Sequence, residues 1–416
     1  MRRISLLGLA LVGVLLLTLP SAFASSGASK ADPGITNRTI KIGGTFALTG
    51  PASGYAPIPG AMKAYFSYIN ARRGPDGKRG VYGRQIIFKY YDDGYNPANS
   101  VQLTRKLVEE DKVFAVVGSL GTEVNEAIQP YLNEKKVPHV LSSTGASEFG
   151  FNYVKYPWSI GWQPDYVGES RIYGLDIVKN HKTAKIGIIY QNDSFGKDHL
   201  YGFKSALGKA KSQIVAEVPF EVTSPTPAAE VAKLKASGAD MLVIFVTPKG
   251  TIQTFGYAKA LGWAPSVIYV TSVSGTTGFM TTAAKSAGDL VNNAVSVVYV
   301  KDPASPLYAK DPAVLEFKKL LAKYAPAANP NEGLNIYGFA KAETFVHALY
   351  KAGKNPTRAS LMKALLSLND TNRFLLPGVK EKTSARDHFI ISQNKLVKWQ
   401  GTSFKEVGAL IESRPR

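Results

Sequence analysis

The sequence has no cysteine among its 416 residues and only five histidines. The absence of cysteine excludes disulfide bonds, thiolate metal sites and a lipid anchor on a cysteine near the N-terminus. The histidines lie far apart, and none stands at a spacing that is typical of a metal site. The sequence therefore predicts no metal centre.

Several sequence motifs of catalysis are also missing. We find no GxSxG nucleophile elbow, no GxGxxG turn and no phosphate-binding loop with its lysine. Asp92 and Asp93 form a carboxylate pair, but two acidic residues in a turn-rich loop are better explained as solvated turn residues than as an acid–base pair. We therefore expect no enzyme, no catalytic residues and no cofactor.

Only one long hydrophobic run is evident, from Ile4 to Leu19, and it follows two arginines. It is short for a membrane span. Small residues follow at the positions expected for cleavage after Ala24. Residues 1–24 therefore have the features of a secretory signal peptide. We expect an exported, unanchored protein, which favours the periplasm, and a disordered leader over residues 25–37.

The formal net charge is +19, from 50 basic and 31 acidic residues. Such a charge is compatible with a nucleic-acid partner. However, the basic residues are spread thinly, in runs no longer than pairs, and export would separate the protein from nucleic acid. We interpret the charge as a solvated basic surface that could still favour anionic ligands.

The chain is organised around residues 113–147. Phe114–Val117 reads as a buried strand, and a helix with apolar residues at a spacing of four begins near Thr122. A second strand, Pro138–Leu141, runs into Ser143, Thr144 and Gly145. In open α/β sheets ligands bind beyond the carboxyl ends of the strands, and helix N-termini with hydroxyls suit a carboxylate. The alternative is that these residues are only turns and caps.

The same order of elements occurs twice. A Lys-Ile-Gly strand at residues 41–43 has a counterpart at 185–187, and the strand 114–117 has a counterpart at 238–246. Each is followed by a polar loop and a helix. Alternating strands and helices predict α/β lobes with parallel sheets and right-handed crossovers, and two such lobes across a cleft suit a hinged binding protein. At the C-terminus, residues 387–391 and 395–399 resemble a closing hairpin.

Several short motifs, taken in order and spacing over residues 38–400, resemble those of a known family, the branched-chain (hydrophobic) amino-acid-binding proteins of ABC importers, which are type I periplasmic binding proteins. The motifs are Leu48-Thr-Gly-Pro51, Tyr82-Gly-Arg84, Asp92-Asp93 with Asn96-Pro-Ala98, the helix end Arg105 to Val113, Val117-Gly118 and Val137-Pro138.

The resemblance implies two Rossmann-like lobes joined by three hinge crossovers, and closure of the cleft on a small ligand. We expect a first lobe of residues 38–157 plus 289–366, and a second lobe of residues 158–288 plus 367–416. It also implies a monomer that docks transiently on an ABC permease in the inner membrane, with no nucleic-acid partner.

The family's ligand contacts carry over to particular positions. The aromatic rings at Tyr55 and Phe195 would line the apolar part of the site, and the hydroxyl of Thr122 with nearby N–H groups would hold a carboxylate. The full set of expected ligand-binding residues is Tyr55, Gly121, Thr122, Ser143, Thr144, Gly145, Asp193, Phe195, Thr247 and Ser272.

One position departs from the family. Many amino-acid binders have a glutamate after the strand equivalent to 267–271, where it pairs with the ligand ammonium, whereas this chain has Ser272-Val-Ser274. A buried ammonium without a counter-charge is costly. Either Asp193 or Glu123 supplies that charge, or the ligand is an aromatic or aliphatic acid, or an amide, without an ammonium.

The leading hypothesis is thus a solute receptor of an importer. A sensor subunit that presents the closed form to a membrane receptor is the alternative, and a neighbouring permease gene would separate the two. A secreted α/β hydrolase is a more remote alternative, which predicts turnover of the ligand.

Overall fold

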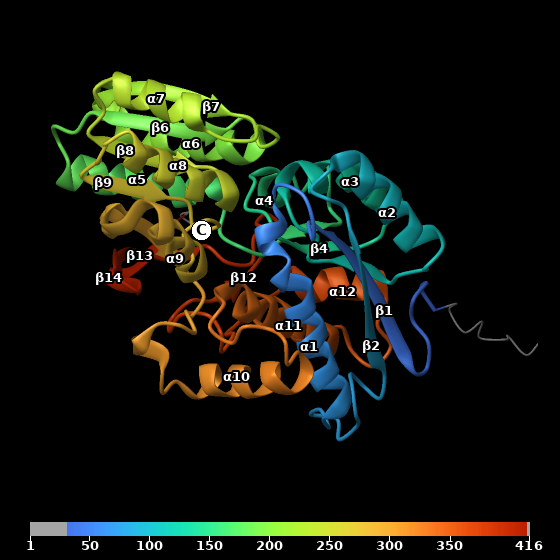
Figure 1. Ribbon diagram of the computed structural model, residues 1–416. Helices are drawn as coiled ribbons and strands as arrows, with labels where there is room; N and C mark the ends of the chain where they lie inside the picture. Colours follow the sequence, from blue (N-terminus) through green and yellow to red (C-terminus); the bar gives the residue numbers. More distant parts are fainter. Residues whose placement is uncertain (1–30, 414–416) are drawn as a thin grey trace, which may run out of the picture. The chain divides into compact units, whose positions relative to one another are not determined.

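A computed structural model describes residues 31–413 of the chain (Figure 1). The predicted signal peptide and residues 25–30 of the predicted leader lie outside this range. Residues 32–37 of that leader have defined partners instead. Ile35 bridges to Ile40, and the carboxylate of Asp32 accepts a hydrogen bond from the backbone N–H of Arg358 at 2.6 Å. This stretch is held to the fold because its backbone groups pair with it.

The first sheet has five strands, all parallel, as the alternation of elements predicts. In sheet order they are β2 (Gln85–Asp92), β1 (Thr39–Phe46), β3 (Ala115–Val117), β4 (His139–Ser142) and β5 (Ser159–Gly161). Its central strands are buried on both faces, which explains their continuous apolar runs.

Helices cover both faces of this sheet. The helices associated with it are α1 (Pro57–Ala71), α2 (Pro97–Glu109), α3 (Thr122–Glu134), α4 (Glu148–Phe151), α10 (Pro312–Tyr324), α11 (Gly333–Ala352) and α12 (Arg358–Leu365). α1 and α11 lie side by side on one face and share its core, whereas α2 and α3 pack on the other (Figure 1). Asn96 starts α2, because its side chain accepts hydrogen bonds from the N–H groups of Ala98 and Asn99.

The second sheet has seven strands. In sheet order they are β14 (Ser403–Glu412), β13 (Gln393–Gln400), β10 (Ala294–Val298), β9 (Val267–Val270), β8 (Met241–Phe245), β6 (Ile186–Gln191) and β7 (Ile214–Phe220). The five strands from β10 to β7 are parallel, and β13 and β14 are antiparallel. Its helices are α5 (Tyr166–Asn180), α6 (Ser194–Leu207), α7 (Ala228–Ala236), α8 (Pro248–Ala260) and α9 (Thr277–Ala287).

The internal repeat predicted from the sequence is visible in the sheet order. The order β2-β1-β3-β4-β5 in the first sheet matches β7-β6-β8-β9-β10 in the second. One Lys-Ile-Gly segment, residues 41–43, lies within β1. The other, residues 185–187, spans the start of the equivalent strand β6. Both halves are therefore doubly wound α/β units.

Three chain segments connect the two sheets, at residues 161–166, 298–301 and 390–393. The first and third run together, since the N–H groups of Gly161 and Ile390 donate to the carbonyls of His388 and Gly161 at 3.1 and 3.2 Å. The second, at Tyr299 to Lys301, pairs with Phe374 to Leu376. The first and third crossovers are thus hydrogen-bonded to each other, and the second is hydrogen-bonded to the first lobe.

Sheet membership defines the lobes as we use them below. The first lobe comprises residues 32–161 and 299–391, and the second lobe comprises residues 162–298 and 392–413. These bounds differ from the expected ones at all three boundaries between the lobes, and most at the second and the third. β10 pairs with β9 rather than with the first sheet, and residues 374–391 pack in the core of the first lobe because Phe374, Leu376 and Ile390 are buried there.

The predicted C-terminal hairpin of residues 387–391 with residues 395–399 was wrong. The hairpin pairs β13 with β14, around residues 401–402. Residues 387–391 belong to the hinge, where Phe389 bridges to Gly161. Their apolar character reflects burial rather than strand formation, since Phe389 packs between the lobes and Ile390 and Ile391 pack in the core of the first lobe. The short strands β11 (Asn369–Asp370) and β12 (Glu381–Lys382) form a separate pair.

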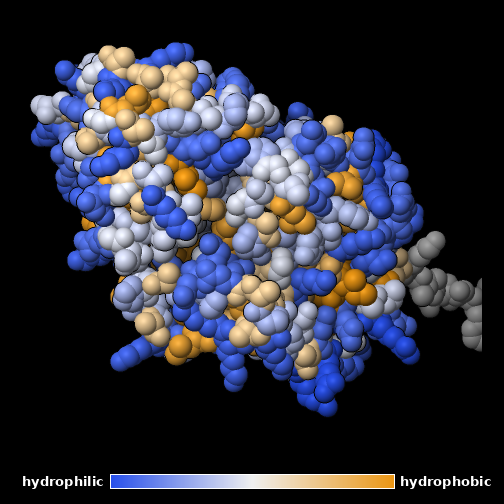
Figure 2. All heavy atoms as spheres, viewed as in Figure 1, coloured by the Kyte–Doolittle hydropathy of each residue, from blue (hydrophilic) through white to orange (hydrophobic). Residues whose placement is uncertain are grey.

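Four short 3₁₀ helices complete the described elements, at Ser53–Tyr55, Gly208–Gln213, Gly288–Asn293 and Pro306–Tyr308. Hydrophilic residues cover most of the face shown in Figure 2, with hydrophobic residues in small separate patches. Within residues 31–413, no helix combines the length and the apolar composition that a membrane span requires.

Candidate ligand-binding site

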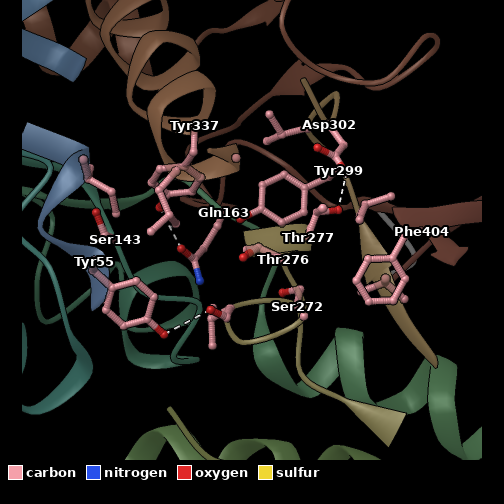
Figure 3. Close-up of a pocket in the computed structure, with 18 of the residues that line it drawn as sticks. Tyr55, Ser143, Gln163, Ser272, Thr276, Thr277, Tyr299, Asp302, Tyr337 and Phe404 are labelled. Atoms are coloured by element: carbon pink, nitrogen blue, oxygen red, sulfur yellow. Dashed lines mark hydrogen bonds between the residues drawn. The ribbon is translucent and has the colours of Figure 1, made fainter. Parts of the chain in front are cut away.

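A pocket lies between the two lobes and is closed at the back by the hinge. Figure 3 shows Tyr55 and Ser143 at one end, Gln163 and Tyr299 in the middle, and Phe404 at the other end. Six of the ten expected residues line it. These are Tyr55, Gly121, Thr122, Ser143, Phe195 and Ser272.

The start of α3 forms part of the first-lobe wall. Gly121 is the N-cap residue and makes no side-chain cap hydrogen bond. Its φ is 106°, and a Cβ there would lie 2.5 Å from the ring of Tyr95, so both backbone conformation and space require glycine. The first N–H groups of an α-helix have no partner within the helix. This turn therefore presents N–H groups and the positive end of a helix dipole beside the pocket.

Hydroxyl groups from two neighbouring strand ends meet at this turn, as the sequence predicts. The Oγ1 atoms of Thr122 and Thr144 are 2.8 Å apart and buried. Thr144 also accepts a hydrogen bond from the N–H of Ala146 at 3.1 Å. Thr122 lines the pocket, whereas Thr144 lies behind it and does not.

Ser143 lines the pocket, and its hydroxyl is already engaged. It donates to the carbonyl of Gly118 at 2.8 Å and accepts a short hydrogen bond from the Nζ of Lys341. Lys341, on α11, also donates to the hydroxyl of Tyr337 at 2.9 Å. Lys341 and Tyr337 could not be predicted as part of the site, because they are nearly 200 residues from Ser143 and belong to no motif.

A chain of hydrogen bonds continues from Tyr337 across the hinge. The hydroxyl of Tyr337 donates to Oε1 of Gln163 at 2.8 Å (Figure 3). Nε2 of Gln163 donates to the hydroxyl of Tyr166 at 3.1 Å. All three residues line the pocket. Burial raises the pKa of both tyrosines, so they stay neutral donors and acceptors.

Tyr55 joins the lobes at the pocket. Its hydroxyl donates to the carbonyl of Val273 at 3.2 Å, the dashed line that starts at Tyr55 in Figure 3. Its ring meets Phe279 edge-on at 6.0 Å. On another side of the cleft, the carboxylate of Asp198 accepts from the N–H and the hydroxyl of Ser147 at 2.7 and 3.2 Å. The lobes are therefore in contact around the pocket.

In the second lobe, Ser272 stands in front of a buried carboxylate. Its N–H and hydroxyl donate to Glu169 at 2.7 and 2.6 Å. Burial alone would raise the pKa of Glu169, but hydrogen bonds from His199 and Ser272 outweigh it and lower the pKa. Tyr173 and Thr271 also donate to this carboxylate. The carboxylate oxygens of Glu169 are thus hydrogen-bonded within the protein. Ser272 lines the pocket, whereas Glu169 does not.

The remaining expected residues lie near the pocket without lining it. Asp193 caps α6, accepting from the N–H of Gly196 at 3.0 Å, and also accepts from Gln191. Thr247 donates to the side chain of Gln191 at 3.0 Å. The carbonyl of Gly145 accepts from the N–H of Tyr166 at 2.8 Å. With Thr144, these residues support the walls of the pocket.

Neither carboxylate proposed as an ammonium partner, Asp193 or Glu123, lines the pocket. Two other carboxylates, Asp302 and Glu406, do so. Asp302 accepts from Thr277 at 2.5 Å, and burial raises its pKa (Figure 3). Glu406 accepts from Tyr308 and is paired with Lys395 at 2.7 Å. The charge of Glu406 is therefore compensated within the protein.

The pocket continues from the start of α3 along the hinge, where its walls are mainly apolar. This part is lined by Val297, Val298, Val300, Leu334, Leu376, Val397 and Phe404. A ligand with one polar head and a hydrophobic body fits such a lining. No group of three or more histidine, aspartate or glutamate side chains in residues 31–413 is arranged to hold a metal ion.

Comparison with known proteins decides the family. The family model described as periplasmic binding protein matches residues 39–403. The chain belongs to this family. Its members bind substrates and are not enzymes, and the two α/β sheets and the cleft have the type I arrangement that the sequence predicts.

The sequence identity to individual relatives is low. The chain is similar to "Leu/Ile/Val-binding protein homolog 3" of Brucella melitensis, with 24% identity over 78% of this chain and 83% of the relative. Among solved structures, a branched-chain amino acid ABC transporter protein of Thermus thermophilus with bound valine is 19% identical, with a TM-score of 0.77 over 91% of this chain and 97% of the other.

A fatty acid ABC transporter substrate-binding protein of Thermomonospora curvata is 22% identical, with a TM-score of 0.74 over 92% of this chain and 95% of the other. At these identities the structural matches establish the fold of this periplasmic binding protein and not its ligand. The ligand has to be inferred from the geometry of the pocket.

Proposed function

We propose that this periplasmic binding protein is the substrate-binding component of an ABC importer and that it captures a small hydrophobic acid in the cleft between its lobes. One observation carries the proposal. The pocket combines a polar end, made by the uncapped start of α3 with Thr122 and Ser143, with apolar walls along the hinge.

The polar end suits a carboxylate. Backbone N–H groups at a helix start and a buried hydroxyl are donors, and the helix dipole favours negative charge. Charge-assisted hydrogen bonds of this kind contribute about 1.5–3 kcal/mol each. The aromatic rings of Tyr55 and Phe195 would contact the hydrophobic body of the ligand.

The ammonium is the feature that separates the two ligand classes. The names of relatives include both branched-chain amino acids and fatty acid. In this chain the residue at the expected glutamate position is Ser272, and the carboxylate behind it, Glu169, is occupied by protein donors. We therefore favour an aliphatic or aromatic acid without an ammonium over an amino acid.

The mechanism we propose is closure of the lobes about the three crossovers. Ligand bound between the lobes would stabilise contacts such as Tyr55 with Val273 and Ser147 with Asp198. The closed form would act as a monomer in the periplasm and dock transiently on an inner-membrane permease, after removal of residues 1–24.

A thermal-shift panel on the chain from Ser25 tests this function. The panel contains valine, leucine, phenylalanine, 4-methylpentanoate, hexanoate, octanoate, benzoate and the amides of these acids. A ligand at 100 times its dissociation constant stabilises the protein by about 2.7 kcal/mol. We expect stabilisation by an acid that lacks the amine. Stabilisation by free amino acids alone would contradict the ligand class, and no shift with any compound would contradict the proposed function.

A further inference from the structure

A lysine is buried in the wall of the pocket without an acidic partner. Lys341 is fully buried on α11. None of the ion pairs among residues 31–413 includes it. Lys301, the other buried lysine of the pocket wall, pairs with Asp311 at 2.8 Å. A buried ammonium without a counter-charge is costly, so Lys341 needs an explanation that Lys301 does not.

Both hydrogen-bond partners of Lys341 line the pocket. Its Nζ donates to the hydroxyls of Ser143 and Tyr337, and both of these residues line the pocket. The same Nζ lies over the rings of Tyr337 and Trp162, at 4.5 and 5.3 Å from their centroids. Aromatic faces favour a cation. The ammonium is thus one hydroxyl away from the pocket at two points.

Other charged groups near Lys341 are engaged elsewhere. On the same helix, Glu343 pairs with Arg373 at 2.8 Å. Glu381 accepts from Thr344 and Asn372. Met62 of α1 and Gly118 after β3, which lie near its side chain, carry no charge. Tyr337 is the one titratable group in direct contact with the Nζ among these residues, and burial raises its pKa.

We propose that Lys341, from its position behind Ser143 and Tyr337, supplies the counter-charge for the anionic head of the ligand, and that it takes up a proton when the acid binds. This inference rests on the proposed function and deepens it, because it assigns the ligand a single negative charge. Burial lowers the pKa of the free lysine well below its usual range. A carboxylate in the pocket reverses that effect, since an opposite charge favours the protonated amine.

The proton uptake has a sign that can be measured. If the ligand-bound protein holds one proton more than the free protein, affinity falls as pH rises, by at most tenfold per pH unit, by linkage. The matching amide carries no charge, so its affinity does not depend on Lys341 in this way. An ordinary structural lysine would produce neither effect.

The test is titration calorimetry with 4-methylpentanoate and octanoate, and with their amides, at pH 8 in phosphate and in Tris. The two buffers release protons with different enthalpies, so the difference in observed heat gives the protons taken up. We expect between a fraction of one proton and one proton per acid bound, and none per amide. This measurement uses the unaltered chain and does not depend on a variant folding.

The matched variants are Lys341→Met and Lys351→Met. Lys351 lies on the same helix but is exposed. We expect Lys341→Met to weaken acid binding about tenfold or more, to abolish proton uptake and to leave amide binding within about twofold. Lys351→Met should behave as the unaltered chain does.

The outcomes separate the two proposals. An acid that binds without proton uptake, or that keeps its preference over the amide in Lys341→Met, overturns the role of Lys341 and leaves the function standing. If none of the four probes, the panel acids or the panel amino acids binds, the proposed function fails and this inference fails with it.

Discussion

The polar end of the pocket is assembled from single residues that belong to separate parts of the chain. Thr122 and Ser143 follow neighbouring strands of a parallel sheet, so the sequence alone places them at one edge. Gln163 and Tyr337 line the same pocket from the hinge and from α11, and Lys341 lies behind Ser143 and Tyr337. No local pattern marks them, because their proximity depends on how the crossovers fold.

The hydroxyl of Thr122 gives the first prediction at this scale. Thr122→Ala removes a donor beside the start of α3 and should weaken binding of an acid about tenfold, which corresponds to about 1.4 kcal/mol. Thr282→Ala, an exposed threonine on α9, is the control. Titration calorimetry on both variants measures the difference, and equal affinities would remove Thr122 from the carboxylate site.

Glu381 predicts how stability depends on pH. Burial raises its pKa from 4.5 to about 7 in the folded protein. Its contribution to stability is thus fully present below about pH 4.5 and is lost as pH rises through 7. Glu381→Gln, which mimics the protonated form, should match the unaltered chain at pH 5 and have the higher melting temperature at pH 8. If the melting temperatures of Glu381→Gln and the unaltered chain change with pH in the same way between pH 5 and pH 8, the assignment is wrong.

At the scale of elements, the repeats were predictable because their central strands are short apolar runs, such as β3 and β8, and their helices carry spaced apolar residues, as in α3. The C-terminal region was not. Residues 387–391 have the composition of a strand, but Phe389 is buried between the lobes at the hinge, and Ile390 and Ile391 are buried in the core of the first lobe. Composition indicates burial there, and only the tertiary arrangement distinguishes a hinge from a hairpin.

The start of α3 yields a prediction about an element. Gly121→Ala places a methyl group in contact with Tyr95 at a φ of 106°, which should cost on the order of 1–3 kcal/mol and displace the helix start. Gly60→Ala is the matched control, because no atom lies within 4 Å of its Cβ position and the residue is inside α1. It should be neutral or stabilise by about 0.5–1 kcal/mol.

Denaturant unfolding and ligand titration distinguish the two glycine variants. We expect Gly121→Ala to lose both stability and affinity, whereas Gly60→Ala should keep its affinity. A Gly121→Ala protein with unchanged affinity would show that the turn does not contact the ligand.

For the whole molecule, lobe contact and ligand binding should be coupled. Asp198→Ala removes the hydrogen bonds to Ser147 that join the lobes. We expect affinity to fall by about three- to tenfold, which corresponds to about 0.7–1.4 kcal/mol, with the order of preferred ligands unchanged. Asp289→Ala, at an exposed position of the second lobe, is the control. A changed order of preference would mean that Asp198 acts on the ligand rather than on closure.

The three crossovers have a further consequence for the order in which the protein can fold. The first lobe needs α10, α11 and α12, which follow the whole parallel part of the second sheet along the chain. The second sheet, in turn, receives its last two strands from residues 393–412. A chain that emerges from its N-terminus therefore cannot complete either lobe until almost all of it is available, and the apolar faces of α1 and β1 must wait for partners made last.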